Sequence, residues 1–367
     1  MRKYRVIISG GGTGGHIFPA IAIANALKAL SPKMEILFIG AEGRMEMEKV
    51  PAAGYNIKGL WISGLQRSLT IKNLSFPFKL ISSLFKAKRI LKQFKPDVAI
   101  GVGGYASGPM LHVAAKAGIP ALLQEQNSYP GITNKLLANK VQKICVAYDG
   151  MERFFPKEKI MLTGNPVRKD IRNLDGKKAS GVEYFKLNPY KKTLLIIGGS
   201  LGARTINQAI EASLNKYAEN DIQVIWQTGN AYFEKAKTAC INYVGKGIYA
   251  HDFISKMDYA YAVADFVVSR AGAISVSELC LVKKPVILIP SPNVAEDHQT
   301  KNAMALVVHN AALLVNDGEA IAKLGNEVLN LSNNIELQEK LRRNIAELGK
   351  ADAAEVIANE VISLIGK

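Results

Sequence analysis

Cysteine is scarce in this chain of 367 residues, which carries only Cys145, Cys240 and Cys280. The three lie far apart, and the sequence has no C-x-x-C pair and no histidine placed beside a cysteine. A disulfide framework and a cysteine-based zinc site are therefore excluded, and we expect buried thiols in a reducing compartment.

Long apolar runs are also missing, since none reaches the roughly 18 residues that a membrane-spanning helix needs. The basic start MRKYR and the small residues of IAIANA raise the alternative of a signal peptide. The apolar segment VIIS is too short for one, and glycines and His16 follow it at once. We therefore expect residues 4–9 to form the first strand of a cytosolic protein.

Acidic residues are absent from residues 49–96, although the whole chain has 31 of them against 47 lysines and arginines, a net charge of +16. This segment holds ten basic residues: Lys49, Lys58, Arg67, Lys72, Lys79, Lys86, Lys88, Arg89, Lys92 and Lys95. Such a block indicates an anionic partner, namely a membrane surface, nucleic acid or a polyphosphate substrate.

Glycine, by contrast, is concentrated in two similar segments, RVIISGGGTGGHIFPAIAIANAL at 5–27 and TLLIIGGSLGARTINQAI at 193–210. Each reads as a strand, a glycine-rich turn and a helix. That order presents backbone N–H groups and the positive end of a helix dipole to a phosphate. Two copies predict two α/β domains whose phosphate-binding ends face a shared cleft.

Strand and helix patterns alternate along the chain, which predicts parallel sheets with ligands at the carboxyl ends of the strands. Strands are expected at 4–9, 35–40, 97–102, 120–124, 143–147, 193–198, 222–227, 265–269 and 285–289. Helices are expected at 18–30, 44–53, 75–94, 107–117, 131–138, 203–217, 255–263, 273–281 and 298–309. The polar stretch 168–192 lacks a clean period and is expected to contain the hinge, and the tail from Asn334 is expected to be helical throughout.

The glycine loops of the first half admit two interpretations. Gly10–His16 contains G-x-G-x-x-G, so an NAD(P)-binding enzyme with Glu42 as the ribose acid is one alternative. The second loop, Gly103–Pro109, leaves room for a diphosphate approached by backbone groups, or it serves only as a helix entry.

Polar residues follow the strands of the second half. Ser200 of the loop Gly198–Arg204 can donate its hydroxyl to a phosphate oxygen. Glu278 can accept both hydroxyls of a ribose, or it only interacts with the helix dipole. Gln299 offers both a donor and an acceptor to sugar hydroxyls, whereas Asp297 is expected to cap a helix.

Together these motifs resemble the MurG family of peptidoglycan glycosyltransferases (glycosyltransferase family 28) over essentially the full length. They are GGGTGGH, GGYASGP, EQN, GNPVR, GGSLGAR, SRAGAISVSE and EDHQTKNA. The resemblance implies an α/β GT-B fold, with two Rossmann-like doubly wound domains facing a central cleft. We expect an acceptor- and membrane-binding domain at 1–165, a UDP-sugar-binding domain at 166–345, and a C-terminal helix at 346–367 packing back on the first domain.

The activity implied is inverting, metal-independent transfer of N-acetylglucosamine from UDP-N-acetylglucosamine to the MurNAc 4-hydroxyl of lipid I, giving lipid II. Another enzyme on the same fold is the alternative, such as a UDP-sugar epimerase or a different lipid-directed glycosyltransferase. An NAD-dependent oxidoreductase and a non-catalytic nucleotide-sugar sensor are weaker ones.

The resemblance also assigns binding residues. Those implied for the donor are Thr13, Gly14, Gly15, Asn127, Arg168, Ser200, Ile254, Ala273, Ile274, Ser275, Val276, Ser277, Glu278 and Gln299. Those implied for the acceptor diphosphate are Gly12, Gly14, Gly103, Gly104, Tyr105 and Ser107. Thr300 stands where many relatives have a second glutamine, so a clamp of two amides on the sugar is not expected.

The sequence contains no D-x-D motif, so we expect no metal and no cofactor. The departing diphosphate is then stabilised by backbone amides, a helix dipole and cations such as Arg168. His16 is the candidate base, because the positive helix end disfavours the imidazolium. Glu125 is the second candidate, and in a further alternative His16 only bonds a phosphate or shapes the turn.

Residues 72–89 interleave apolar and basic side chains, a pattern that suits an anionic membrane surface. The predicted patch is Lys72, Leu74, Phe76, Phe78, Lys79, Ile81, Phe85 and Lys86. An amphipathic helix with its apolar face in the core is the alternative. Nucleic acid is disfavoured, since no binding module surrounds the block. The resemblance places the protein peripherally on the cytoplasmic face of the cell membrane, with cell-wall synthesis and division proteins as partners.

Overall fold

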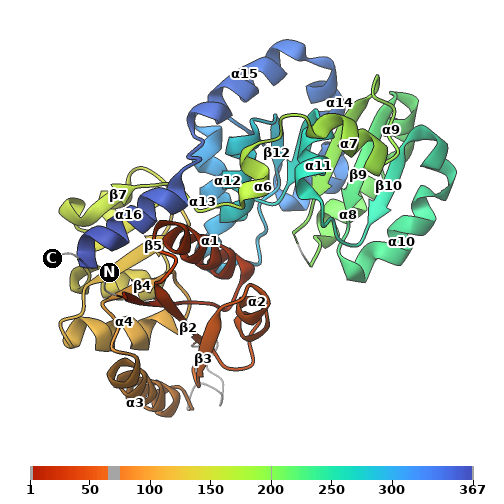
Figure 1. Cartoon of the computed structure of the whole chain (residues 1–367). Coiled ribbons are helices and arrows are strands. Elements are labelled where there is room, and N and C mark those ends of the chain that lie inside the picture. The colour runs from red at the N-terminus through yellow and green to blue at the C-terminus, as the bar shows by residue number, and fades with distance from the viewer. Residues whose placement is uncertain (1–2, 65–74, 200, 366–367) are drawn as a thin grey trace. The chain divides into compact units, whose positions relative to one another are not determined.

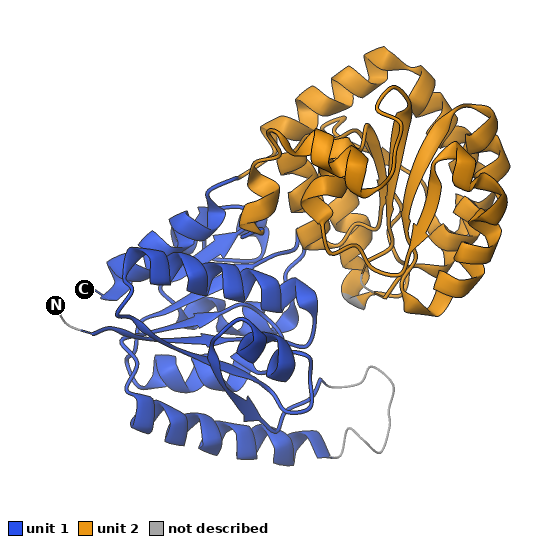
Figure 2. Ribbon diagram, turned by 45° about the vertical axis from the view of Figure 1, so that its right-hand side comes forward, with its two compact units in different colours: residues 1–167, 351–367 blue, residues 168–350 orange. Residues whose placement is uncertain are grey.

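The computed structural model describes residues 3–64, 75–199 and 201–365, so the predicted site residues Lys72, Leu74 and Ser200 lie outside the described residues. The chain divides into two compact units (Figure 2). Unit 1 comprises residues 1–167 and 351–367, and unit 2 comprises residues 168–350. Each unit is built around its own parallel sheet with helices on both faces (Figure 1).

The sheet of unit 1 has seven parallel strands in the order β3-β2-β1-β4-β5-β6-β7. Their bounds are β1 Arg5–Ser9, β2 Glu35–Ala41, β3 Asn56–Leu60, β4 Val98–Gly101, β5 Ala121–Glu125, β6 Lys143–Val146 and β7 Ile160–Leu162. The central strand β1 pairs Val6 with Ile36 of β2 on one side and with Val98 of β4 on the other. The strand order reverses between β1 and β4, and ligands of such sheets bind at this point.

Among the described residues of unit 1, the helices that flank this sheet are α1 Gly14–Leu30, α2 Glu46–Ala52, α3 Phe76–Phe94, α4 Ser107–Lys116, α5 Ile132–Leu137 and α16 Ala353–Ile365. Alternate residues of β1 enter opposite halves of the core. Ile7 packs on the side of α3 and α4, whereas Val6 and Ile8 pack on the side of α1 and α16. Because helices cover both faces, these strand residues are all buried.

The sheet of unit 2 has six parallel strands in the order β10-β9-β8-β11-β12-β13. Their bounds are β8 Lys192–Ile197, β9 Ile222–Gln227, β10 Ile248–His251, β11 Phe266–Ser269, β12 Val286–Leu288 and β13 Leu313–Leu314. The order reverses between β8 and β11. The prediction of two doubly wound, Rossmann-like domains is confirmed.

The helices of unit 2 are α6 Lys169–Arg172, α7 Lys177–Tyr184, α8 Arg204–Glu211, α9 Leu214–Glu219, α10 Asn230–Cys240, α11 Met257–Val263, α12 Ala273–Val282, α13 His298–Val307, α14 Ala320–Asn333 and α15 Ile335–Glu347. Short 3-10 turns in unit 1 are η2 Ala138–Lys140, η3 Met151–Arg153 and η4 Lys157–Lys159. Those in unit 2 are η5 Ile241–Lys246, η6 Ala295–Asp297 and η7 Asp317–Glu319. Within the described ranges, no helix combines the length and the apolar character needed to cross a bilayer.

Three expectations about helices were wrong. The stretch 168–192, where no helix was expected, contains α6 and α7. The single helix expected at 203–217 is two helices, α8 and α9, interrupted at Ala212 and Ser213. The tail is interrupted as well, since α15 belongs to unit 2 whereas α16 belongs to unit 1 and packs on α1.

Candidate active site

The two glycine loops of unit 1 contact each other at the carboxyl ends of β1 and β4. The N–H of Gly11 donates to the carbonyl of Gly103 over 3.3 Å. Gly104 has a φ of +82°, and a Cβ there would overlap the carbonyl of Gly11. Only glycine permits both this backbone conformation and this approach, so the sequence itself brings the loops together.

The first loop leads directly into α1. Thr13 is the exposed N-cap residue, and Gly14 and Gly15 form the first positions of the helix. The first N–H groups of a helix have no acceptor within it, and the dipole makes this end positive. The exposed start of α1 therefore has the chemistry of an anion site.

His16 lies in the first turn of α1, half-buried between the two loops. Its Nδ1 is 2.9 Å from the carbonyl oxygen of Gly11 and 3.3 Å from the hydroxyl of Thr13. A carbonyl can only accept, so Nδ1 must carry the proton, and in the neutral ring Nε2 carries the lone pair. A Cβ at Gly103 would lie 2.8 Å from Nε2, which puts this edge of the ring beside the second loop.

The other residues predicted for the acceptor diphosphate differ in their orientation. Tyr105 is 53% exposed, whereas Ser107 is buried and donates its hydroxyl to the carbonyl of Gly104 at 2.9 Å. Ser107 therefore shapes the second loop. The N–H of Gly12 donates to the buried carboxylate of Glu46 at 3.0 Å, so this amide already has an anionic partner.

Glu125, the second candidate base, ends β5 and is 2% exposed. Its Oε1 accepts from the backbone N–H of Asn127 at 3.0 Å and from that residue's side-chain amide at 3.3 Å. Its Oε2 accepts from the N–H of Gly131 at 3.1 Å and from Nδ2 of Asn134 at 2.8 Å. These four hydrogen bonds to one carboxylate hold the loop before α5 in place. To accept a proton, Glu125 would have to lose one of them.

A buried amide network behind this loop was missed by sequence reasoning. Gln124 donates to the side chain of Asn165 at 2.9 Å, and Asn165 donates to the carbonyl of Gln126 at 3.0 Å. Gln126 in turn donates to the carbonyl of Val102 at 2.9 Å, next to the second glycine loop. Gln126 belongs to the EQN motif and Asn165 to the GNPVR motif, and Gln124 directly precedes the first, but nothing in the sequence indicates their pairing.

In unit 2, Glu278 and Arg168 form an ion pair although 110 residues separate them. Nε of Arg168 lies 3.3 Å from Oε1 of Glu278, whose side chain is 9% exposed. Oε2 of Glu278 accepts from the hydroxyl of the buried Tyr261 at 3.2 Å. Burial raises the pKa of Glu278, and Arg168 opposes that rise. Burial and the carboxylate of Glu278 hold the pKa of Tyr261 well above its usual value.

Gln227 connects the glycine loop of unit 2 to the segment after β10. Its Nε2 donates to the carbonyl of Gly199 at 3.1 Å, and its Oε1 accepts from the N–H of Ile254 at 3.1 Å. The glycine loop and the predicted donor-binding residue Ile254 are thereby held by one buried side chain. Sequence reasoning missed Gln227, whose only local signal is a polar residue at the end of an apolar strand.

The predicted segment 273–278 forms the first turns of α12. Ala273, Ile274 and Ser275 are half-buried at its start, but Val276 is 1% exposed, so its side chain belongs to the core. The hydroxyl of Ser277 donates to the carbonyl of Ala273 at 3.0 Å. The backbone at the start of α12 and the carboxylate of Glu278 are therefore the groups that this segment offers to a ligand.

Gln299 lies in the first turn of α13, beyond β12. Its Oε1 accepts from the N–H of Ser291 at 2.9 Å. The hydroxyl of Thr300 donates to Asp297 at 2.6 Å, and Asp297 occupies the N-cap position without a side-chain bond to the helix backbone. Thr300, the residue that follows Gln299, is thus engaged with Asp297 at the start of the helix.

Comparison with known families covers both units. The model of the glycosyltransferase family 28 N-terminal domain matches residues 6–146, and that of the glycosyltransferase family 28 C-terminal domain matches residues 193–357.

Individual proteins match along their whole length. The UDP-N-acetylglucosamine--N-acetylmuramyl-(pentapeptide) pyrophosphoryl-undecaprenol N-acetylglucosamine transferase of Parabacteroides distasonis is 56% identical over 367 residues, 100% of both chains. The protein of the same name from Cytophaga hutchinsonii is 57% identical over 364 residues, 99% of this chain and 98% of that one. The crystal structure of Acinetobacter baumannii MurG superimposes with a TM-score of 0.81 at 26% identity, covering 98% of this chain and 99% of that one. The chain therefore belongs to glycosyltransferase family 28 and has the fold of its two-domain, GT-B members.

Proposed function

We propose that this protein transfers N-acetylglucosamine from UDP-N-acetylglucosamine to lipid I, the undecaprenyl-pyrophosphoryl-MurNAc-pentapeptide, to give lipid II. The observation that carries the proposal is the likeness, over the full length of the chain, to transferases named for this reaction. The two glycine loops of unit 1 and the Arg168–Glu278 pair of unit 2 are the parts of the chain that such a reaction would use.

For the donor, we assign the nucleotide to the carboxyl edge of the unit 2 sheet. The carboxylate of Glu278 accepts the two ribose hydroxyls, and Arg168 keeps it oriented. The loop at 198–203 and the start of α8 bind the diphosphate of the donor. The backbone at Ile254 contacts the nucleotide's base. Gln299 binds sugar hydroxyls through its amide nitrogen, since its oxygen is used within the loop.

For the acceptor, we assign the diphosphate of lipid I to the start of α1 and the second glycine loop. The 4-hydroxyl oxygen of MurNAc attacks C1 of N-acetylglucosamine as its proton passes to Nε2 of His16. The bond from C1 to the β-phosphate oxygen breaks, and UDP leaves with the electron pair. One such displacement inverts C1. His16 is favoured over Glu125 because four N–H donors already occupy the latter's oxygens.

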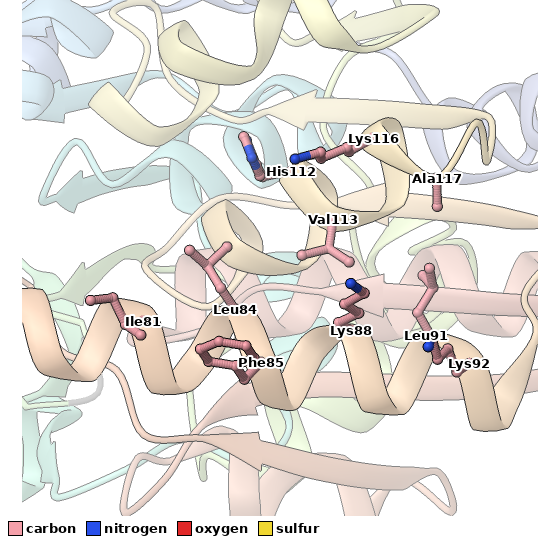
Figure 3. Close-up of a pocket in the computed structure, with 10 residues that line it drawn as sticks. All are labelled: Ile81, Leu84, Phe85, Lys88, Leu91, Lys92, His112, Val113, Lys116 and Ala117. Atoms are coloured by element: carbon pink, nitrogen blue, oxygen red, sulfur yellow. The ribbon is translucent and has the colours of Figure 1, made fainter.

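The membrane surface is assigned to α3 and α4 (Figure 3). Phe78, Ile81 and Phe85 are 71%, 53% and 72% exposed at positions i, i+3 and i+7 of α3. The alternative of an apolar face in the core holds for the other side of α3, where Ala87, Ile90 and Leu91 are buried, but it does not account for this exposed stripe. The same stripe continues with Lys88 and Lys92, so apolar contact and positive charge follow one another on one helix face.

A groove of about 500 Å³ lies between α3 and α4 beside this stripe. Leu84 and Val113 lie within it, and its described lining has Lys88, Lys92 and Lys116 but no Asp or Glu (Figure 3). Burial, and next the charges of Lys140 and Lys116, lower the pKa of His112 at its edge. We infer that the groove receives the phosphate of an anionic lipid.

Two lysines of the predicted patch have other partners. Lys86 forms an ion pair with Glu42 at 2.7 Å. Lys79 donates to Ser63 at 3.0 Å and lies over the ring of Trp61. Their charges are therefore partly satisfied within the protein, and we expect Lys88 and Lys92 to contribute more to lipid binding.

Replacing Lys88 and Lys92 together by glutamine should weaken binding to vesicles that contain anionic phospholipid about 30-fold. Each basic residue at such a surface contributes about 1 kcal/mol. Cosedimentation with vesicles measures the partition coefficient. The matched control is the pair Lys237→Gln and Lys340→Gln, on exposed positions of α10 and α15. Equal binding by the two double variants would contradict the assignment of the membrane surface.

The proposed reaction is tested with radiolabelled UDP-N-acetylglucosamine and a lipid I analogue, with and without EDTA. We expect label to appear in the lipid product at the same rate in both samples. Release of free sugar without acceptor would identify an epimerase instead, and binding without turnover would identify a sensor. Transfer that EDTA abolishes would contradict the metal-free mechanism alone.

A further inference from the structure

A buried carboxylate lies behind the first glycine loop of unit 1. Glu46 begins α2 and is 1% exposed. Its Oε1 accepts from the N–H of Ala41 at 2.9 Å, and its Oε2 accepts from the N–H of Gly12 at 3.0 Å. A Cβ at Gly11 or Gly40 would overlap this side chain, so two glycines keep the space that it fills.

A single peptide group connects Glu46 to His16. The peptide between Gly11 and Gly12 donates its N–H to Glu46, while its carbonyl accepts from Nδ1 of His16 at 2.9 Å. Hydrogen bonds in such a chain polarise one another. The negative charge on Glu46 draws the N–H of Gly12 and makes the carbonyl of Gly11 a stronger acceptor.

We propose that Glu46 is a positioning residue for His16, acting through the Gly11–Gly12 peptide. By strengthening the bond to Nδ1–H, it fixes the imidazole in the tautomer and orientation that present Nε2 to the acceptor hydroxyl. The carboxylate beside the histidine of serine hydrolases does this directly. Here a peptide group stands between the two side chains. The inference rests on the proposed function, in which His16 takes the proton of the acceptor.

A purely structural Glu46 would make a different prediction. A side chain that only fills space behind the loop can be replaced by glutamine, which has the same shape, without any change at His16. In the positioning role, glutamine removes the charge and also turns an N–H donor toward one of the two backbone N–H groups. The Gly11 carbonyl then weakens as an acceptor, and the imidazole loses its preference for the Nδ1–H tautomer.

The test is the ¹⁵N NMR spectrum of the histidine side chains, with the resonances of His16 assigned from the His16→Asn variant. Wild-type protein should hold His16 in the Nδ1–H tautomer. In Glu46→Gln the Nε2–H fraction should rise at least about twofold, and kcat should fall about tenfold, as is typical when a supporting residue is lost. The control is Glu48→Gln on the same helix, whose side chain is 77% exposed. It should match wild type in both measurements.

Two results would overturn the proposal. One is an Nε2–H tautomer at His16 in the wild-type protein, which needs no Glu46 variant and so decides the matter even if Glu46→Gln does not fold. The other is a folded Glu46→Gln protein whose His16 spectrum superimposes on that of wild type. If His16→Asn keeps wild-type kcat, the assignment of the base fails, while the tautomer measurement still decides the role of Glu46.

Discussion

Replacing His16 by asparagine should lower kcat for transfer to lipid I by about 10²–10⁴-fold, the usual contribution of a positioned general base. Asparagine can still donate to the carbonyl of Gly11 from its amide, so the loop keeps its shape. What is lost is the basic nitrogen beside the second glycine loop. Steady-state kinetics with a lipid I analogue measure the change, and KM for UDP-N-acetylglucosamine should move much less than kcat.

His309→Asn is the control for this substitution, because His309 is exposed after the end of α13 in unit 2. It should leave kcat unchanged. The acid limb of the pH–rate profile should disappear in His16→Asn and persist in the control. A His16→Asn enzyme that retains both its rate and its acid limb would show that the imidazole is not the base.

The loops that carry the proposed site could be predicted because their signal is local. A β-branched run, a glycine cluster and a helical pattern within about 20 residues leave few folds available. As expected, α1 follows β1 and α8 follows β8 after a few residues of the glycine-rich segments. The contact of the two loops in unit 1 also follows, because neighbouring parallel strands end at the same edge of a sheet.

Helix α7 was missed because its sequence lacks a clean helical period. The segment is polar and contains Gly181, which lowers helix propensity. In the fold, that glycine is a contact point: a Cβ there would lie 2.9 Å from the carbonyl oxygen of Tyr259 and 2.6 Å from Val263 in α11. Close packing of α7 against α11 requires a small residue at this position, although glycine lowers the helix propensity of the segment. Tertiary packing outweighed propensity here.

The buried supports of the site could not be predicted, because they bond to backbone groups of distant segments. Glu46 and Gln227 each connect two loops through amides and carbonyls that every residue possesses. Nothing in the sequence marks the partner of such a bond. The partners of charged side chains could not be predicted for the same reason. Residues 49–96 have no acid, yet Lys86 is paired with Glu42 from outside the segment.

Glu278→Gln should weaken the binding of UDP-N-acetylglucosamine roughly 100-fold. Hydrogen bonds to a charged group contribute about 1.5–3 kcal/mol each, and neutral ones about 0.5–1.5 kcal/mol. Glutamine keeps one acceptor atom and loses the charge, so the difference for two ribose hydroxyls is about 3 kcal/mol. Isothermal titration calorimetry measures the affinity. Glu234→Gln, at an exposed position of α10, is the control and should bind as wild type does.

The pKa of Glu278 separates this loss of binding from a loss of folding. Burial raises that pKa above the ordinary value of 4.5, with Arg168 opposing the rise. A carboxyl of this kind stabilises the fold fully below its unfolded pKa, and that contribution is lost as pH rises through the folded value. Glu278→Gln avoids the loss, so its Tm relative to wild type should increase as pH rises above the ordinary carboxyl value of 4.5. Arg168, with 41% of its side chain exposed, remains solvated without its partner. Weak binding together with a lower Tm at the higher pH would instead make Glu278 a structural residue and remove it from the donor site.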